Sequence, residues 1–232
     1  EGYARVNQKM AVVNITTWPG WLNTLNGVMW QWTDSVPVLY LSGQVKYSTT
    51  MDSCKEIPLR QLGDQEVDIV SVVKPLTKYA EMVRDPYDIK YHLDRAIYLA
   101  THGRFGPTWL DIPLNVQATM IDETKLREYD PKEDELMLPN IDNEISQLVQ
   151  MIKESKRPLF VDGHWIRLSG AIKEFEELVA KTNIPVVTTM NGFDTVTEDN
   201  PNFAARMGTV ANRAGNFTLQ NADLVITVGS RN

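Results

Sequence analysis

The sequence has a single cysteine, more acidic than basic residues and no long apolar run, and each of these features excludes a class of protein. Cys54 alone forms neither an internal disulfide nor a zinc site, so we expect a reducing, cytoplasmic compartment. Lysine and arginine number 23 against 30 acidic residues, a net charge of -7, which argues against a nucleic-acid partner. No apolar run reaches the roughly 18 residues of a membrane span, so no membrane partner is expected.

Motifs of catalysis and metal binding are also scarce. The sequence has no nucleophile elbow, no HExxH pattern and no paired carboxylates to accompany His92, His102 and His164. Asp111 lies in an apolar strand, where a buried carboxylate that caps nearby amides is a more common role than catalysis. The residues alone therefore point to no catalytic and no metal-ligating side chain in this chain.

Hydrophobic periodicity predicts alternating strands and helices. Strands are expected at 10–17, 36–41, 108–112, 158–161, 184–188 and 224–228. Helices are expected at about 21–32, 66–73, 78–82, 86–101, 140–156, 168–181 and 209–220. Such repeated units with buried, β-branched strands are typical of parallel sheets that carry helices on both faces.

The irregular segments divide the chain. Residues 45–66 predict a long loop, and residues 119–139, charged and with two prolines, predict a solvated surface linker. The fold class is therefore α/β, with two doubly wound parallel-sheet domains at 1–118 and 140–232 joined by this linker. Both termini fall at elements of the fold, and we expect both domains to be incomplete.

Four loops follow predicted strands, at the sheet edge where open α/β proteins bind ligands. They are Trp18-Pro19-Gly20, Ser42-Gly43-Gln44, Gly163-His164-Trp165 and Gly229-Ser230-Arg231. Glycine lets the backbone approach a phosphate, although Trp165 stands where a dinucleotide turn has its second glycine. Ordinary turns explain the same pattern, so these residues alone indicate only an α/β protein with a nucleotide-like ligand.

Several segments together resemble thiamine diphosphate-dependent enzymes of the acetolactate synthase type. In chain order they are Glu1–Arg5, Thr17–Asn23, Asp34–Pro37, Ser42–Val45, Asp64–Glu66 with Lys78, Arg104–Pro107, Trp109–Pro113, Asn221–Ile226 and Gly229–Arg231. Thr17–Asn23 is similar to the GPG-x-x-N loop of that family. The resemblance extends in order over nearly the whole chain.

The resemblance implies most of a pyrimidine-binding domain followed by about half of a Rossmann-like central domain. It implies thiamine diphosphate and Mg²⁺ as cofactors of the intact enzyme, FAD in members that keep a flavin, and a homodimer or homotetramer. The substrate would be a small 2-oxo acid that is condensed or decarboxylated. The activating glutamate and the magnesium motif of the family have no counterpart in these residues, so we expect no turnover from this polypeptide alone.

The resemblance also implies roles for seven residues. Pro19 and Gly20 shape the cofactor loop, and Gln44 and Gln65 line the substrate channel. A flavin nucleotide would be contacted by Arg104, Gly208 and Thr209. Two of these residues fit simpler roles equally well, because Gln44 can cap its strand and Arg104 can pair with a linker carboxylate.

Some residues depart from the family pattern. Trp18, Trp21, Trp30 and Trp165 replace small residues, and Leu114 stands where acetolactate synthases carry a lysine. Natural divergence, engineering that fills a cofactor cavity, and a different mode of association each explain the tryptophans. The alternatives to an acetolactate synthase-like enzyme are an oxalyl-CoA or other 2-oxo acid decarboxylase, and a non-catalytic scaffold or interaction module with exposed indoles.

Overall fold

The computed structural model describes residues 1–231, and two compact units make up the chain. Unit 1 is Glu1–Met137 and unit 2 is Leu138–Asn232. Each unit contains one four-stranded sheet whose paired strands are all parallel. The expected α/β class with two parallel-sheet domains is therefore confirmed. In residues 1–231 no helix combines the length and the apolar character that crossing a membrane requires.

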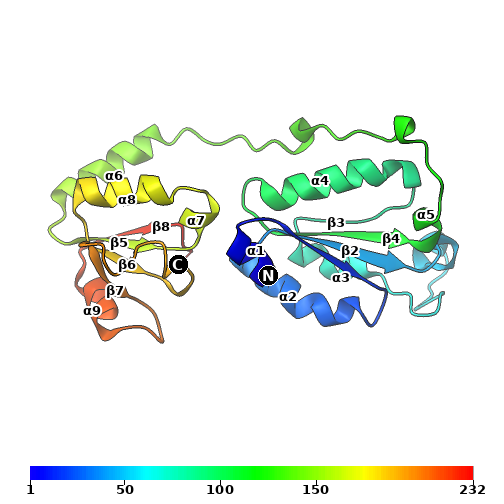
Figure 1. Cartoon of the computed structure of the whole chain (residues 1–232), viewed down its shortest axis with the longest axis horizontal. Helices are drawn as coiled ribbons and strands as arrows, with labels where there is room; N and C mark the ends of the chain where they lie inside the picture. Colours follow the sequence, from blue (N-terminus) through cyan, green and yellow to red (C-terminus); the bar gives the residue numbers. More distant parts are fainter. Residues whose placement is uncertain (232) are drawn as a thin grey trace. The chain divides into compact units, whose positions relative to one another are not determined.

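The sheet of unit 1 has the strand order β1-β2-β4-β3. Its strands are β1 (Ala11–Ile15), β2 (Val38–Gln44), β3 (Tyr79–Met82) and β4 (Pro107–Pro113). Its helices are α1 (Gly2–Asn7), α2 (Leu25–Asp34), α3 (Ile69–Val73), α4 (Ile89–Thr101) and α5 (Leu114–Gln117). In Figure 1, α4 covers one face of this sheet, and α2 and α3 cover the other. The central strands β2 and β4 are consequently the most deeply buried.

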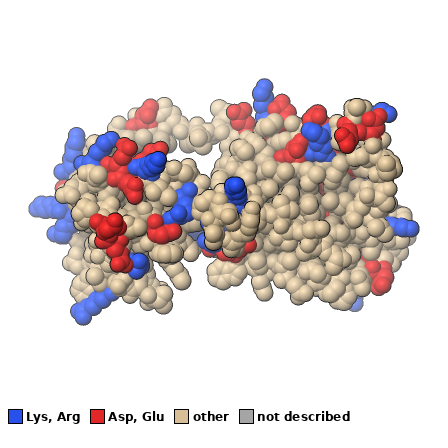
Figure 2. Space-filling view, viewed as in Figure 1, with Lys and Arg blue, Asp and Glu red and all other residues tan. Residues whose placement is uncertain are grey.

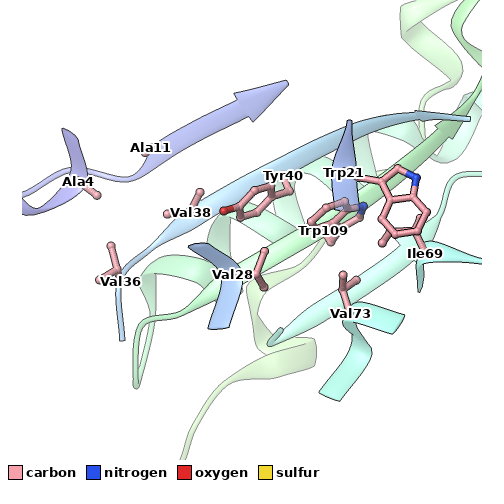
Figure 3. Packing of buried hydrophobic residues seen from close by; sticks show 10 residues of the cluster. All are labelled: Ala4, Ala11, Trp21, Val28, Val36, Val38, Tyr40, Ile69, Val73 and Trp109. Carbon is pink, nitrogen blue, oxygen red and sulfur yellow. The ribbon is translucent and has the colours of Figure 1, made fainter. Parts of the chain in front are cut away.

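Aromatic side chains fill the core between this sheet and helices α2 and α3. Tyr40 of β2 and Trp109 of β4 stack with ring centroids 4.8 Å apart, and Figure 3 shows Trp21 beside Trp109 and Ile69. Trp21 is only 2% exposed. Trp21 follows the Pro19 turn, and the short 3-10 helix Trp21–Thr24 turns its indole into the core.

The sheet of unit 2 has the order β7-β6-β5-β8. Its strands are β5 (Pro158–Asp162), β6 (Val186–Thr188), β7 (Phe203–Arg206) and β8 (Leu224–Val228). Its helices are α6 (Asp142–Glu154), α7 (Trp165–Leu168), α8 (Ile172–Thr182) and α9 (Arg213–Asn221). Separate hydrophobic clusters fill the two faces, with α6 and α8 on one side and α9 on the other (Figure 1).

Four expectations about single elements were wrong. The helix expected at 78–82 is instead strand β3, which pairs with β4. A run this short carries too little periodicity to distinguish a helix from a strand. The helix expected at 168–181 begins only at Ile172, because Gly170, with a φ of +73°, lies in the turn that separates α8 from the short α7. The helix expected from 209 begins only at Arg213, and strand β7 was not expected.

Residues 127–134, which we call the strap, belong to the segment that we expect to be a linker, and although most of them are exposed, their side chains contact α4. Arg95 donates to both carboxylate oxygens of Asp134 at 2.8 and 2.9 Å. Tyr91 donates to Glu133 at 2.8 Å, and the guanidinium of Arg127 stacks 3.7 Å from the Tyr91 ring. The Arg95 guanidinium holds the pKa of Asp134 below its usual range. The strap therefore belongs to unit 1, and its charges gather over α4 at the top of Figure 2.

Candidate functional site

A cleft of about 710 Å³ opens at the carboxyl edge of the sheet in unit 1. The ends of β1, β2 and β4 and the start of α5 contribute its walls. The lining residues are Asn14, Ile15, Thr16, Thr17, Leu41, Ser42, Gly43, Gln44, Val45, Ile112, Leu114 and Gln117. This volume and this mixture of apolar walls with a few polar groups are typical of small-molecule sites.

The predicted cofactor loop forms a tight turn directly after β1. The Gly20 amide donates to the Thr17 carbonyl at 2.9 Å. A Cβ atom at position 20 would lie 2.8 Å from Cγ2 of Thr16, so only glycine fits this turn without displacing a neighbour. Trp18 and Pro19 are exposed in the same turn. The structure thus places Pro19 and Gly20 beside the cleft wall formed by Thr17.

Gln44 lines the cleft from the end of β2, where it belongs to a buried hydrogen-bond network. Its Nε2 donates to Oδ2 of Asp111 at 2.9 Å and to the carbonyl of Val67 at 3.1 Å. Ser42 donates to Oδ1 of Asp111 at 2.5 Å, and the Trp109 indole donates to Ser42 at 2.8 Å. The amide of Val45 donates to Oε1 of Gln44. The alternative role of Gln44 as a strand cap is therefore also present.

Asp111 is the charged centre of this network. It is 0% exposed, as its apolar neighbours in the sequence indicated. Burial raises its pKa to about 6, the Asp68 carboxylate adds to this rise, and the hydrogen bonds from Ser42 and Gln44 oppose it. The network joins β2, β4 and the segment before α3 at the base of the cleft.

Gln65 and Glu66 connect the long loop, residues 45–66, to the same edge. Thr17 Oγ1 donates to the Gln65 carbonyl at 2.9 Å. Glu66 is buried and closes the loop, because its carboxylate accepts hydrogen bonds from the amides of Met51 at 2.5 Å and Leu62 at 2.9 Å. The structure thus brings Gln44, Gln65 and the Pro19 turn to one edge of the sheet, with the Gln65 side chain exposed.

The other three predicted site residues lie elsewhere. Arg104 precedes β4, and its Nε donates at 2.9 Å to Ser35, which precedes β2. Arg104 is therefore at the amino edge of the sheet, opposite the cleft. Gly208 and Thr209 belong to unit 2, where the Gly208 amide donates to Oδ1 of Asn216 at 2.9 Å. Their predicted contact with a flavin stays a prediction.

The turn after β5 has little capacity left for an anionic ligand. The amides of Gly163 and Trp165 donate to the carbonyls of Val228 and Gly229. Asp162 is fully buried, and neither of its carboxylate oxygens has a hydrogen-bond donor in residues 1–231. Burial raises its pKa to about 7, and the nearby Asp194 carboxylate adds to this rise. Beside the turn, Trp165 lines an apolar groove of about 420 Å³.

Sequence reasoning missed two of the residues that organise these regions. Glu66 was noted only as part of a motif, although an acidic residue directly before a helical run of apolar residues is a usable signal for a buried cap. Asp162 follows four apolar strand residues, which was a signal for burial. The pairing of Arg95 with Asp134 had no local signal, because the two residues are 39 positions apart.

The parallel sheets, the carboxyl-edge cleft and the glycine turn define an α/β protein with an open cleft of the size typical of small-molecule sites. Residues 1–72 match the family described as thiamine pyrophosphate enzyme, N-terminal TPP binding domain. Residues 145–232 match the family described as thiamine pyrophosphate enzyme, central domain. The chain belongs to the thiamine pyrophosphate enzyme family, which confirms the resemblance seen in its motifs.

Acetolactate synthases are among the proteins that this chain is similar to. It is 32% identical to the acetolactate synthase large subunit of Lactococcus lactis, with 100% of this chain and 39% of the relative covered. It is 31% identical to the large subunit of Cyanidium caldarium, with the same coverage. It is also 31% identical to the chloroplastic acetolactate synthase of Arabidopsis thaliana, where 33% of the relative is covered. The chain thus spans about two fifths or less of the length of these relatives.

The residues present fit one of the three implied cofactors. The cleft of unit 1 suits a flat heteroaromatic ring, because Ile15, Leu41 and Ile112 offer apolar walls and Gln44 a polar group. No group of three or more His, Cys, Asp or Glu side chains in residues 1–231 is arranged to hold a metal ion, so we assign no magnesium ligand here. For a flavin diphosphate, the turn after β5 offers amides that are already bonded and a buried acid.

Proposed function

We propose that unit 1 supplies the pyrimidine side of a thiamine diphosphate site in an enzyme that acts on 2-oxo acids. The observation that carries this proposal is the cleft at the carboxyl edge, where the Gly20 turn, Gln44 and Leu114 meet. The similarity to acetolactate synthases over the whole chain supports carboligation of 2-oxo acids as the reaction of the polypeptide that contains it. Groups that this chain lacks would come from the rest of that site, so we expect residues 1–232 alone to produce no acetolactate.

The proposal is tested by titrating residues 1–232 with thiamine diphosphate and following the heat of binding. Leu114 is half exposed in the cleft, and Leu114→Trp should fill it and weaken binding at least tenfold. Leu138→Trp is the matched control, because Leu138 is exposed outside the cleft and should leave binding unchanged. No binding by the unmodified chain, or equal binding by both variants, would overturn the proposal and favour the non-catalytic scaffold.

Leu114 specifically favours a second candidate, a 2-oxo acid decarboxylase. Carboligation brings a second anionic 2-oxo acid to the site. Acetolactate synthases carry a lysine at the position of Leu114, and the apolar Leu114 side chain offers no positive charge to the carboxylate of that second acid. The polypeptide that contains this chain should be supplied with pyruvate, thiamine diphosphate and Mg²⁺. Acetolactate as the product supports the first candidate, and acetaldehyde with carbon dioxide supports the second.

Four further properties belong to the same proposal. They include magnesium as a cofactor of the intact enzyme and flavin binding through Arg104, Gly208 and Thr209. Assembly into a dimer or tetramer is checked by analytical ultracentrifugation. The cytoplasmic location inferred from the single cysteine stays a prediction.

A further inference from the structure

Almost every hydrogen-bonding group of the Gln44 side chain already has a partner within the chain. Its side chain has two N–H donors and one carbonyl oxygen with two lone pairs. Both donors are used, by Asp111 at 2.9 Å and by the Val67 carbonyl at 3.1 Å. The oxygen accepts from the Val45 amide at 3.0 Å, which leaves one lone pair. Gln44 lines the cleft, so the group that it has left for a ligand there is an acceptor.

Asp111 fixes the orientation of the Gln44 carboxamide, because an ionised carboxylate only accepts hydrogen bonds. Both of its neighbours in the network donate to it, Ser42 to Oδ1 and Gln44 to Oδ2. The Ser42 oxygen already accepts from the Trp109 indole, so its own hydrogen is directed to Asp111. If Gln44 turned its amide over, its oxygen would face both the Asp111 carboxylate and the Val67 carbonyl. The network therefore permits one orientation of the Gln44 carboxamide.

We propose that Asp111 is a positioning residue that holds the Gln44 carboxamide with its nitrogen inward, so that the cleft binds a ligand group that donates a hydrogen bond. The inference rests on the proposed function only for the choice of ligand, for which the amino group of an aminopyrimidine is the donor we expect. The network is complete in the structure without that ligand. The orientation of Gln44 can consequently be tested separately.

The variant that separates this role from simple packing is Asp111→Asn. Asparagine has nearly the same shape, but one of its two terminal atoms is a nitrogen that donates. That nitrogen would face either Ser42 or Gln44, and both of these already donate. If the nitrogen faced Ser42, the hydroxyl would have to turn its hydrogen away and accept a second bond beside that from the Trp109 indole. We expect the nitrogen to face Gln44 instead, which removes the acceptor of the Gln44 amide with little change in volume. Ser42→Ala is the matched control, because it removes the other bond to Asp111 and leaves the one from Gln44.

The first experiment follows the side-chain amide of Gln44 by NMR in residues 1–232, without any ligand. In the unmodified chain its two protons should exchange slowly, and their shifts should change with a midpoint near pH 6 as Asp111 titrates. Asp68 is the other charged group that acts on Asp111. Asp111→Asn should abolish the midpoint and speed up exchange, and Ser42→Ala should keep exchange slow. An unchanged Gln44 amide in Asp111→Asn would overturn the proposal.

The second experiment compares the binding of thiamine with that of oxythiamine, in which a carbonyl oxygen replaces the pyrimidine amino group. The unmodified chain and Ser42→Ala should prefer thiamine about fivefold or more, the value of one hydrogen bond. Asp111→Asn should lose this preference. Gln44→Leu, which keeps the side-chain volume, should lose it too and replaces Asp111→Asn as the test if that variant does not fold. Equal preferences in all four proteins would overturn the proposal. Absence of thiamine binding from the unmodified chain would instead overturn the proposed function, with the NMR result still deciding the role of Asp111.

Discussion

Replacing Asp162 by asparagine changes one buried charge and almost nothing else in unit 2. The side chain ends β5 and is fully buried, and its carboxylate oxygens have no hydrogen-bond donor in the described residues. The amide of Thr189 is directed to the backbone carbonyl of Asp162, at 3.0 Å. Asn and Asp have nearly equal volumes, so the substitution isolates the cost of ionising this buried acid.

The pKa of Asp162 gives the size and sign of that cost. Burial raises it from 3.8 to about 7, and each pH unit of difference corresponds to about 1.4 kcal/mol. The folded carboxyl is harder to ionise than the unfolded one. Stability is therefore intact below about pH 4, and it decreases as the pH rises, by about 4 kcal/mol once pH 7 is passed. The Asn variant escapes this loss.

Urea unfolding at several pH values, followed by hydrogen exchange of the β5 amides, measures the difference. Relative to the unmodified chain, Asp162→Asn should gain stability between pH 5 and pH 8, by a few kcal/mol at the upper end. Glu176→Gln is the matched control, since Glu176 is exposed on α8, and it should show no such trend. A gain that does not change with pH would refute the reasoning, because it would mean that Asp162 stays neutral or finds a donor.

Other substitutions test the remaining contacts. Arg95→Gln removes the two bonds to the strap and should cost about 1 kcal/mol, so proteolysis within the strap should accelerate about fivefold. Glu66→Gln leaves at least one buried amide of the long loop without an acceptor and should cost roughly 1–3 kcal/mol, seen as faster hydrogen exchange in that loop. Gly192→Ala would place Cβ 2.6 Å from Oδ1 of Asp162 and should destabilise unit 2 by roughly 1–3 kcal/mol in thermal unfolding. Gly2→Ala, with no atom within 4 Å, should have no comparable effect.

The central strands were predictable from the sequence because their signals are local. In β2 and β4, which run in the middle of the sheet, neighbouring strands and helices bury both faces, so the sequence reads as an apolar run. The edge strand β3 lacks this signal because only its last residue, Met82, is buried. Its form is decided by pairing with β4, which lies 25 or more residues away in the chain.

The candidate site was predictable only in part for the same reason. The Pro19 turn and Gln44 follow local strand signals, so their place at the carboxyl edge could be inferred. The direction in which Gln44 donates depends on Asp111, 67 positions later, and no local pattern carries that information. The strap is similar, because charged and aromatic residues such as Tyr129 are typical of a solvated linker until α4 supplies their partners.

Asp111 and Asp162 allow burial and hydrogen bonding to be separated within one chain. Both are fully buried acids near the ends of parallel strands, with pKa values raised to about 6 and about 7. Both Asn variants should therefore gain on the unmodified chain as the pH rises from about 4 to those values, and the gain should level off above them. Only Asp111 accepts two side-chain hydrogen bonds, and Asn cannot accept both. Above pH 7, where both acids are ionised, the gain in urea unfolding should be about 4 kcal/mol for Asp162→Asn and only about 3 kcal/mol for Asp111→Asn, because the bonds from Ser42 and Gln44 stabilise the ionised Asp111. Equal gains of the two variants above pH 7 would show that the bonds from Ser42 and Gln44 contribute nothing.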